Sequence, residues 1–237
     1  MNLSIIIPLY NEEKLIKEVV KNINLVSFPN FLNRYEIIIV DDASTDNSNN
    51  VATNLSHEHS HVQLYTHQKN QGKGAAVRTG IKHSSGDVVL IQDANLELSP
   101  TDIPSLLLAM HELKIGFVNG SRYMHGVLRP LSSYKRYLAN QFFTFLTSII
   151  VNVKLTDMAC GYKLVEKDLL NQISLKENRF GFEAEIILKA LRVKKNNIVE
   201  IPVKYFPRNQ GEGKKLNNLD GFKILWTIFK FGLLNMK

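Results

Sequence analysis

The segment from Asp87 to Glu97 reads DVVLIQDANLE. Its first part is a short apolar run, mostly of β-branched residues, and this pattern predicts a buried strand. Its second part, from Asp93 onward, carries carboxylate and amide oxygens. In open α/β sheets ligands bind outside the carboxyl ends of the strands, and such oxygens suit a hard cation such as Mg²⁺ or Mn²⁺. Taken alone, the segment fits either a metal site or a solvated turn that caps a helix.

On both sides of this segment, apolar runs alternate with helical patterns. We expect strands at 3–9, 36–40, 62–65, 87–91 and 116–119, and helices at 12–23, 46–55, 74–83 and 102–113. This alternation predicts an α/β fold, a mostly parallel sheet with helices on both faces. The loops at 11–12, 41–46, 70–73 and 93–97 would then gather along one sheet edge, where α/β proteins bind nucleotides.

Beyond residue 120 the pattern changes to longer helices. We expect helices at 132–151, 182–193 and 219–234, with one strand at 198–205. A chain of 237 residues is long enough for one large α/β domain. We therefore predict a single domain over 1–237, with a first half at 1–120 and a second half at 121–237.

The charge is unevenly distributed between the two parts of the chain. Residues 1–100 carry a formal net charge of −3, whereas residues 101–237 carry +10. The basic part favours an anionic partner such as phosphate, nucleic acid or an acidic membrane surface. The single cysteine, Cys160, excludes an internal disulfide and a cysteine-based zinc site, and it favours a reducing, cytoplasmic setting.

Neither a signal peptide nor a membrane span is expected. The chain begins directly with the apolar run at 3–8, which we interpret as a core strand. The longest apolar stretch, 142–153, contains several polar residues and is shorter than the ~20 residues that a spanning helix needs.

Two further loops offer groups that bind nucleotides. Asp41 and Asp42 follow the second strand, where they could hold a ribose hydroxyl or a base N–H, or help to cap the next helix. The segment 71–76 opens a helix and combines free N–H groups with Lys73, which favours phosphate. It lacks the spacing of a Walker A loop, so a P-loop nucleotidase is disfavoured. The polar segment 209–218 is either a basic lid over an anionic ligand or a plain surface loop.

The order of these motifs resembles that of family 2 glycosyltransferases with the GT-A fold, specifically the branch of dolichyl-phosphate mannose and glucose synthases. The matched motifs are IPLYNEE (7–13), VDDASTD (40–46), NQGKG (70–74), QDANLE (92–97), GSRY (120–123), LTDMACGYK (155–163), FGFEAE (180–185), EIPV (200–203), Arg208 and EGKK (212–215). They span nearly the whole chain. The resemblance implies a GT-A fold in which residues 1–120 bind a nucleotide sugar and residues 121–237 face the acceptor.

The resemblance also assigns roles to individual residues. The residues implied to contact the donor's base and ribose are Pro8, Tyr10, Glu12 and Asp42, with Asp41 beside them. The loop of Asp93, Ala94, Asn95 and Glu97 is implied to face the diphosphate, with Mg²⁺ or Mn²⁺ held by Asp93 and Asn95. The cations implied to surround donor and acceptor phosphates are Lys73, Arg122, Arg136, Arg208, Lys214 and Lys215. Asp157, Asp93 and Arg122 are the implied catalytic residues, with Asp157 orienting the acceptor or acting as a base.

The main departure from the family is Asn95, where the Asp-x-Asp motif normally has its second aspartate. An amide oxygen still binds Mg²⁺ or Mn²⁺, but it removes one negative charge, so we expect weakened metal binding. Glu97, two residues further on, is our candidate for compensation. Glu183 and Glu185 start a helix, where acids complement the helix dipole, and we interpret them as structural.

Two apolar stripes bear on the acceptor. The first comprises Phe142, Phe143, Phe145, Leu146, Ile149 and Ile150, and the second Phe222, Leu225, Trp226, Phe229 and Leu233, with Lys223 and Lys230 nearby. Amphipathic helices of this kind lie in a bilayer interface, pack in a core or form a homodimer interface.

The function implied is an inverting transfer of a hexose from a UDP- or GDP-linked sugar to a polyprenyl (dolichyl or undecaprenyl) phosphate. We expect the enzyme to be cytoplasmic and peripheral on the membrane face. The alternatives are a family 2 transferase that acts on a saccharide acceptor, and a catalytically impaired nucleotide-sugar-binding protein. Nucleic-acid binding is disfavoured, because the chain lacks an interleaved basic and aromatic motif.

Overall fold

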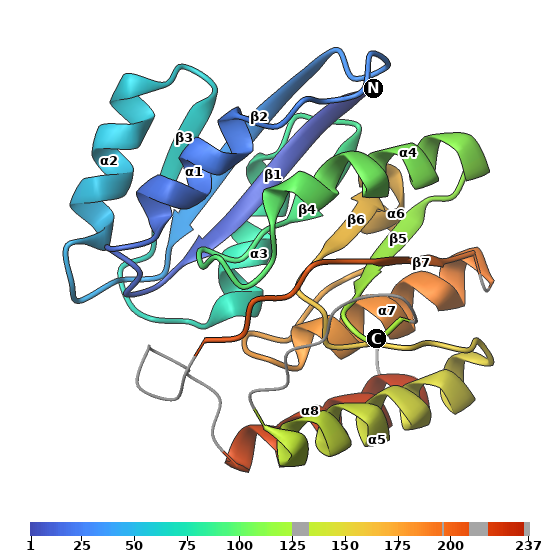
Figure 1. Ribbon diagram of the computed structural model, residues 1–237. Helices are drawn as coiled ribbons and strands as arrows, with labels where there is room; N and C mark the ends of the chain where they lie inside the picture. Colours follow the sequence, from blue (N-terminus) through green and yellow to red (C-terminus); the bar gives the residue numbers. More distant parts are fainter. Residues whose placement is uncertain (125–132, 196, 209–217, 235–237) are drawn as a thin grey trace.

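The computed structural model describes residues 1–124, 133–195, 197–208 and 218–234, and one seven-stranded sheet runs through it (Figure 1). The strand order is β3-β2-β1-β4-β6-β5-β7. Every strand pairing is parallel except the two that β6 makes. Helices cover both faces, which confirms the predicted mostly parallel α/β sheet.

The first half of the sheet follows the predicted alternation. Its strands are β1 (Asn2–Leu9), β2 (Arg34–Asp41), β3 (Val62–Thr66) and β4 (Val88–Ile91). Ile5, Ile6 and Ile7 of β1 are fully buried, because this central strand has helices on both sides. Ile5 and Ile7 face one core and Ile6 faces the other, as the alternation of side chains along a strand requires.

The helices separate into layers that match these two cores. One face carries α1 (Ile16–Asn24), α2 (Ser48–Glu58), and α4 (Ile103–Leu113), which is preceded by a 3₁₀ turn, η1 (Pro100–Asp102). The other face carries α3 (Lys73–His83), α6 (Lys167–Gln172) and α7 (Phe182–Lys194). Two more helices, α5 (Tyr134–Val151) and α8 (Asn218–Gly232), lie side by side against α7 (Figure 1).

The second half completes the sheet with β5 (Phe117–Ser121), β6 (Lys163–Glu166) and β7 (Val199–Pro202). The sequence analysis missed β6 and α6. β6 has only four residues and begins with a lysine, so it offers no apolar run of normal strand length. The predicted strand at 198–205 is shorter than expected, since only an isolated bridge between Tyr205 and Leu98 continues beyond Pro202.

The first predicted helix begins at Ile16 rather than at Glu12. Residues 12–15 form a turn, in which the Glu12 carbonyl accepts hydrogen bonds from the N–H groups of Leu15 and Ile16. The backbone N–H of Glu12 donates to Ser48 Oγ at 2.8 Å. This contact fixes the end of β1 to the start of α2. Of the helices described here, none has the length and hydropathy to cross a bilayer.

Candidate active site

A cleft of about 480 Å³ lies at the carboxyl ends of β1, β2 and β4. The predicted residues that line it are Pro8, Tyr10, Glu12, Asp42, Lys73, Asp93, Ala94, Asn95, Glu97, Arg122 and Arg208. The predicted loops therefore meet at one sheet edge, as expected from the parallel topology. Asp41, Arg136 and Asp157 are outside this lining, and Lys214 and Lys215 lie outside the described residues.

Asp42 shapes the end of the cleft next to β2. Its carboxylate accepts hydrogen bonds from the backbone N–H groups of Gln71 at 2.9 Å and Gly72 at 2.6 Å, and it contacts His67 Nδ1 at 2.7 Å. Gly72 has φ of +104°, and a Cβ there would lie 2.4 Å from the carbonyl oxygen of Asn178. Only glycine fits this position without strain.

Asp41 does not line the cleft, although we expected it beside the residues that contact the donor's base and ribose. Its side chain is buried and accepts hydrogen bonds from the Ser44 N–H and hydroxyl and from the Asn49 amide. These partners hold the loop between β2 and α2. Asp41 thus supports the loop from behind, whereas Asp42 reaches the cleft.

Three of the N–H groups at the start of α3 already have protein partners. The N–H groups of Gln71 and Gly72 donate to Asp42, and that of Ala75 donates to the Asn178 carbonyl at 3.2 Å. Protein groups therefore already use donors that the sequence analysis assigned to phosphate. The loop 177–179, which supplies one of these groups, is remote in sequence and could not be placed there from the sequence alone.

Lys73 lies at the centre of the cleft in a triad with two carboxylates. Its Nζ is 2.7 Å from Asp93 Oδ1 and 2.8 Å from Glu183 Oε1. Burial alone would lower the pKa of Lys73, but the two carboxylates outweigh this effect and raise it. Lys73 is therefore a fixed cation at neutral pH.

The acidic loop follows β4 as expected. Asp93 lines the cleft, and its Oδ2 packs against Gly161, where an added Cβ would lie only 2.5 Å away. Asn95 Oδ1 accepts a hydrogen bond from the backbone N–H of Glu97 at 2.9 Å, so the amide stabilises the turn of its own loop. No group of three His, Cys, Asp or Glu side chains with metal-binding geometry occurs among the described residues. An Mg²⁺ or Mn²⁺ ion at this loop would need further oxygen ligands from water or from a bound substrate.

Arg208 connects the segment after β7 to the end of β1. Its guanidinium makes two hydrogen bonds to the Glu12 carboxylate, at 2.9 and 3.1 Å, and its backbone N–H donates to Glu97 Oε1 at 3.1 Å. Bidentate pairs of this kind are geometrically specific. They bring together three predicted site residues from distant parts of the chain.

Arg122 and Asp157 form a second bidentate pair beside the cleft. Arg122 Nε and Nη2 donate to the two carboxylate oxygens of Asp157 at 2.7 and 2.9 Å, and Asn140 Nδ2 donates to Oδ1 at 2.9 Å. Burial would raise the pKa of Asp157, but the Arg122 charge and these hydrogen bonds lower it. A carboxylate so occupied is suited to positioning Arg122 and is a poor base.

The sequence that forms this cleft falls largely within the match to a known family. The profile described as "Glycosyl transferase family 2" matches residues 4–174. The chain belongs to glycosyl transferase family 2. One relative is the dolichol-phosphate mannosyltransferase of Pyrococcus furiosus, which is 30% identical over 97% of this chain and 63% of that protein. The chain thus spans about three fifths of the length of that relative.

Two further comparisons cover most of both chains. A UDP-N-acetylglucosamine–dolichyl-phosphate N-acetylglucosaminyltransferase of Methanococcus voltae is 28% identical over 94% of this chain and 93% of that protein. Among solved structures, glucosyl-3-phosphoglycerate synthase from Mycobacterium tuberculosis, in complex with Mn²⁺, UDP and glucosyl-3-phosphoglycerate, aligns with a TM-score of 0.75 at 18% identity. That alignment covers 98% of this chain and 80% of the synthase, and it confirms the GT-A fold.

In this family 2 transferase, a buried network stands behind the Arg122–Asp157 pair. The Lys163 ammonium is fully buried and donates to Asn119 Oδ1 at 2.8 Å and to the carbonyls of Met158 and Cys160, each at 3.1 Å. Asn119 in turn donates to the Asp157 carbonyl and to Glu200, both at 2.9 Å. The network holds the loop 156–161 that carries Asp157, and the sequence analysis did not assign it.

Sequence reasoning also missed several residues that line the transferase cleft. They are Leu9, Asn70, Gly72, Ala76, Leu98, Ala159, Gly161, Arg179, Phe180, Glu183, Tyr205 and Ile224. Glu183 was interpreted as structural, yet it lines the cleft and pairs with Lys73, while its Oε2 is buried without a hydrogen-bond partner among the described residues. The available signal was its motif, FGFEAE, which matches the family.

Glu185, by contrast, has the expected structural role. It is fully buried, accepts hydrogen bonds from the N–H groups of Lys176 and Glu177, and pairs with Lys189 at 2.8 Å. It therefore holds the loop before α7 against the helix.

Proposed function

We propose that this chain transfers a hexose from a nucleotide sugar to a polyprenyl phosphate, with inversion, at a membrane surface. The observation that carries the proposal is the position of the cleft. It begins at the donor loops of β1, β2 and β4 and reaches Ile224 of α8, a helix whose outer side is apolar. A site that joins a polar nucleotide end to an apolar helix suits a lipid-linked acceptor.

The donor's base and ribose fit the end formed by Pro8, Tyr10, Glu12 and Asp42, which lie together in the lining. Asp42 is held rigidly by its N–H partners, so its position is preorganised. The orphaned Glu183 Oε2 is a suitable acceptor for a hydroxyl of the hexose.

The charge balance of the cleft supports a divalent cation with the donor. Five acids line the described cleft (Glu12, Asp42, Asp93, Glu97 and Glu183), against four bases (Lys73, Arg122, Arg179 and Arg208). The lining is therefore slightly negative before a diphosphate enters, and an anionic ligand needs a counter-charge. The oxygen donors of Asp93 and Asn95 suit Mg²⁺ or Mn²⁺, with the remaining ligands from the diphosphate.

When bound, such an ion would neutralise charge that develops on the departing nucleoside diphosphate. Lys73 fixes the orientation of Asp93 through the 2.7 Å pair. Asp157 positions the Arg122 guanidinium at the side of the cleft where the acceptor would lie. Because a phosphate acceptor is already ionised near neutral pH, attack on the anomeric carbon requires little proton abstraction.

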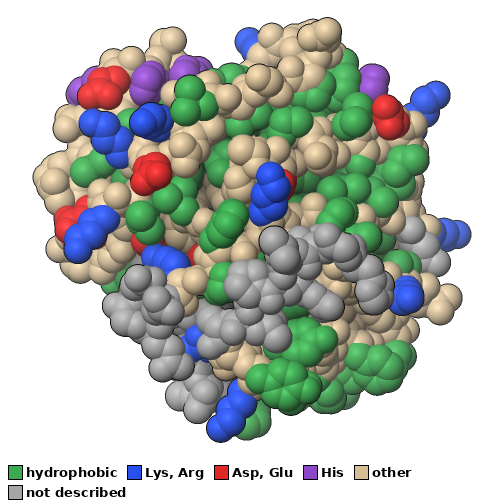
Figure 2. All heavy atoms as spheres, viewed as in Figure 1, with side chains coloured by type: hydrophobic (Ala, Val, Ile, Leu, Met, Phe, Trp, Pro, Cys, Tyr) green, Lys and Arg blue, Asp and Glu red, His purple; other side chains and the backbone are tan. Residues whose placement is uncertain are grey.

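The outer face of α5 and α8 supports docking to a membrane. The exposed apolar side chains on these helices and directly after α8, 37% to 74% accessible, are Tyr134, Leu138, Phe142, Phe145, Ile149, Phe222, Leu225, Trp226, Phe229, Leu233 and Leu234. Figure 2 shows hydrophobic side chains gathered at the lower side of the molecule, where Figure 1 draws these helices. Lys135, Arg136 and Lys223 lie on the same helices and would favour an anionic surface.

The first predicted stripe divides between the two environments. Phe143, Leu146 and Ile150 pack against the core around α7, whereas Phe142, Phe145 and Ile149 are exposed. The core-packing alternative therefore holds for one side of α5 only. We propose that the other side binds the cytoplasmic membrane face, and a homodimer through this face is the competing outcome.

The test offers vesicle-embedded undecaprenyl or dolichyl phosphate and a sugar-capped acceptor side by side, with UDP- and GDP-hexoses and Mn²⁺. We expect label in the polyprenyl phosphate. Transfer to the saccharide acceptor alone would refute the proposal. Nucleotide-sugar binding without turnover would instead indicate the catalytically impaired alternative.

A further inference from the structure

The four cations that line the described cleft differ in whether a protein carboxylate contacts them. Lys73, Arg122 and Arg208 each contact a carboxylate of the protein, at 2.7 to 2.9 Å. Arg179 lines the same cleft, yet its guanidinium pairs with no carboxylate among the residues that the structure describes. Its positive charge is therefore not offset by a direct partner, unlike that of the other three.

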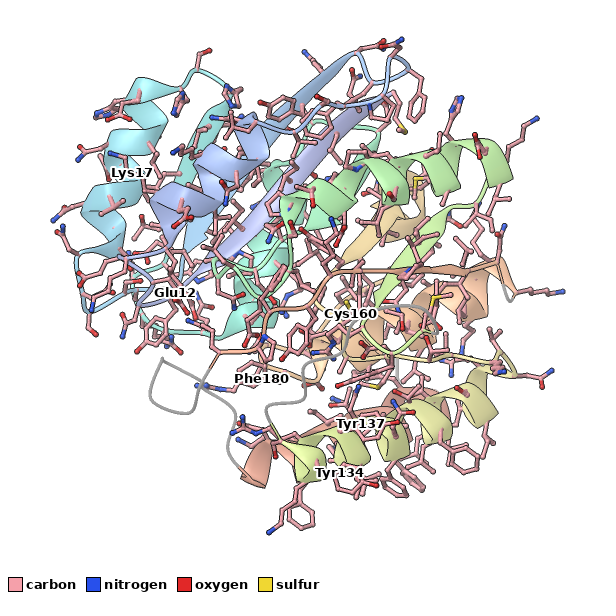
Figure 3. The ribbon with its side chains drawn as sticks, in the orientation of Figure 1. Glu12, Lys17, Tyr134, Tyr137, Cys160 and Phe180 are labelled. Carbon is pink, nitrogen blue, oxygen red and sulfur yellow. The ribbon has the colours of Figure 1, made fainter. Side chains whose placement is uncertain are left out.

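The surroundings of Arg179 place it between the donor loops and the apolar helices. A Cβ built on Gly72, in the loop before α3, would lie 2.8 Å from Arg179 Cγ, so the arginine stem packs over that glycine. Phe180 and Ile224 of α8 line the same cleft. Figure 3 shows Phe180 between the sheet edge with Glu12 and helix α5, which carries Tyr134 and Tyr137.

The backbone that carries Arg179 is held on both sides. Glu185 accepts hydrogen bonds from the N–H groups of Lys176 and Glu177 at 2.7 to 3.0 Å. Arg78 donates to the Glu177 carbonyl at 2.6 Å and to the Asn178 side chain. The Arg179 carbonyl itself accepts from Phe182 N–H at 3.2 Å. A cation on so firmly held a loop loses little backbone freedom on binding a ligand.

We propose that Arg179 is a phosphate-binding residue of this cleft. The inference rests on the proposed function for its ligand, which is a phosphate of the nucleotide-sugar donor or the phosphate of the polyprenyl acceptor. A guanidinium presents a planar fork of N–H donors that matches phosphate oxygens. The charges of the other three cations are neutralised by protein carboxylates, so Arg179 offers a positive charge to a ligand. Acids outnumber bases in the described lining, which makes this charge the more useful to an anion.

The test compares Arg179→Met and Arg179→Lys with a matched control, Arg34→Met. Arg34 is also exposed, but it lies at the opposite, amino-terminal end of β2. One arm measures UDP and GDP binding by calorimetry with Mn²⁺. The other measures binding to vesicles with and without undecaprenyl phosphate. Neither arm requires turnover, so both remain informative if transfer to polyprenyl phosphate fails.

We expect Arg179→Met to lower the binding affinity measured in one of the two arms about tenfold or more, which is the usual effect of losing a charge-assisted hydrogen bond. We expect Arg179→Lys to weaken it less, Arg34→Met to change neither arm, and thermal midpoints to stay equal. A loss in the nucleotide arm identifies the donor as the source, and a loss confined to undecaprenyl phosphate vesicles identifies the acceptor. Binding in both arms within twofold of wild type overturns the proposal, as does a wild-type protein that binds neither ligand.

Discussion

Asp157 is fully buried, and both of its carboxylate oxygens are engaged by Arg122 and Asn140. Lys73 is also held by ion pairs, because its ammonium lies between the carboxylates of Asp93 and Glu183. At the scale of single residues, the site is thus built from pairs that fix one another's position. Removing one partner of such a buried pair leaves the other charge uncompensated.

The first test at this scale concerns Asp157→Asn. Loss of the buried pair should lower the free energy of unfolding by about 3–5 kcal/mol at pH 7 and reduce the rate of transfer. The pKa of Asp157 is lowered in the folded state, so its contribution is present above the unfolded value near 3.8 and is lost as pH falls through the folded pKa.

Urea unfolding between pH 7 and pH 2.5 checks this expectation. Below about pH 4, where a free aspartate protonates, wild type should lose stability more steeply than Asp157→Asn. Parallel pH curves for the two proteins would contradict the assigned ion pair.

The second residue-scale test restores the charge that Asn95 lacks. One charge pair at ~4 Å and an effective dielectric of ~20 is worth at most about 4 kcal/mol, so a tenfold gain in metal affinity is well within reach. We expect Asn95→Asp to lower the Mn²⁺ concentration for half-maximal transfer by about tenfold. Glu97→Gln should raise this Mn²⁺ concentration if Glu97 compensates for Asn95. The same Mn²⁺ concentration in wild type and both variants would argue against a metal at this loop.

At the scale of elements, α5 and α8 carry the apolar face that we assign to the membrane. Trp226 of α8 is 58% exposed and Leu25, at the end of α1 on the other side of the sheet, is 71% exposed. These two residues provide a matched pair of exposed apolar positions, one on the proposed docking face and one away from it.

Trp226→Glu should weaken binding to anionic vesicles about tenfold or more, since burying a large apolar side chain contributes about 1.5–3 kcal/mol. Leu25→Glu should bind as wild type does. Sedimentation of both variants with vesicles measures this difference. Equal binding would exclude α8 from the membrane contact, and a change in oligomeric state on Trp226→Glu would point to a dimer interface instead.

The elements also show where sequence reasoning succeeded. β1 was predicted to within a residue, because its apolar run is long. β6 was missed because its lysine is buried through carbonyl and amide acceptors that come from other segments. About half of the cleft lining was predicted, from strand ends and from the resemblance to the family. The Lys73–Glu183 and Arg208–Glu12 pairs depend on the folded path of the chain and could not be predicted.

At the scale of the whole molecule, one sheet joins the two halves of the chain. β6 pairs with β4 of the first half and with β5, so the boundary near residue 120 falls inside the sheet. We propose that residues 1–237 fold as one domain. Calorimetry should then give a single transition with equal calorimetric and van't Hoff enthalpies. Two separable transitions would contradict this proposal.

We propose that the cleft moves a sugar onto a membrane-embedded phosphate. The most direct measurement incubates wild type and Asp93→Asn with labelled nucleotide sugar, Mn²⁺ and vesicles containing polyprenyl phosphate, and counts label in the lipid fraction. We expect lipid-linked label with wild type and a loss of about 100-fold or more with Asp93→Asn, since removing a preorganised electrostatic contact costs this much. No lipid-linked label with wild type, or equal label with both proteins, would contradict the account.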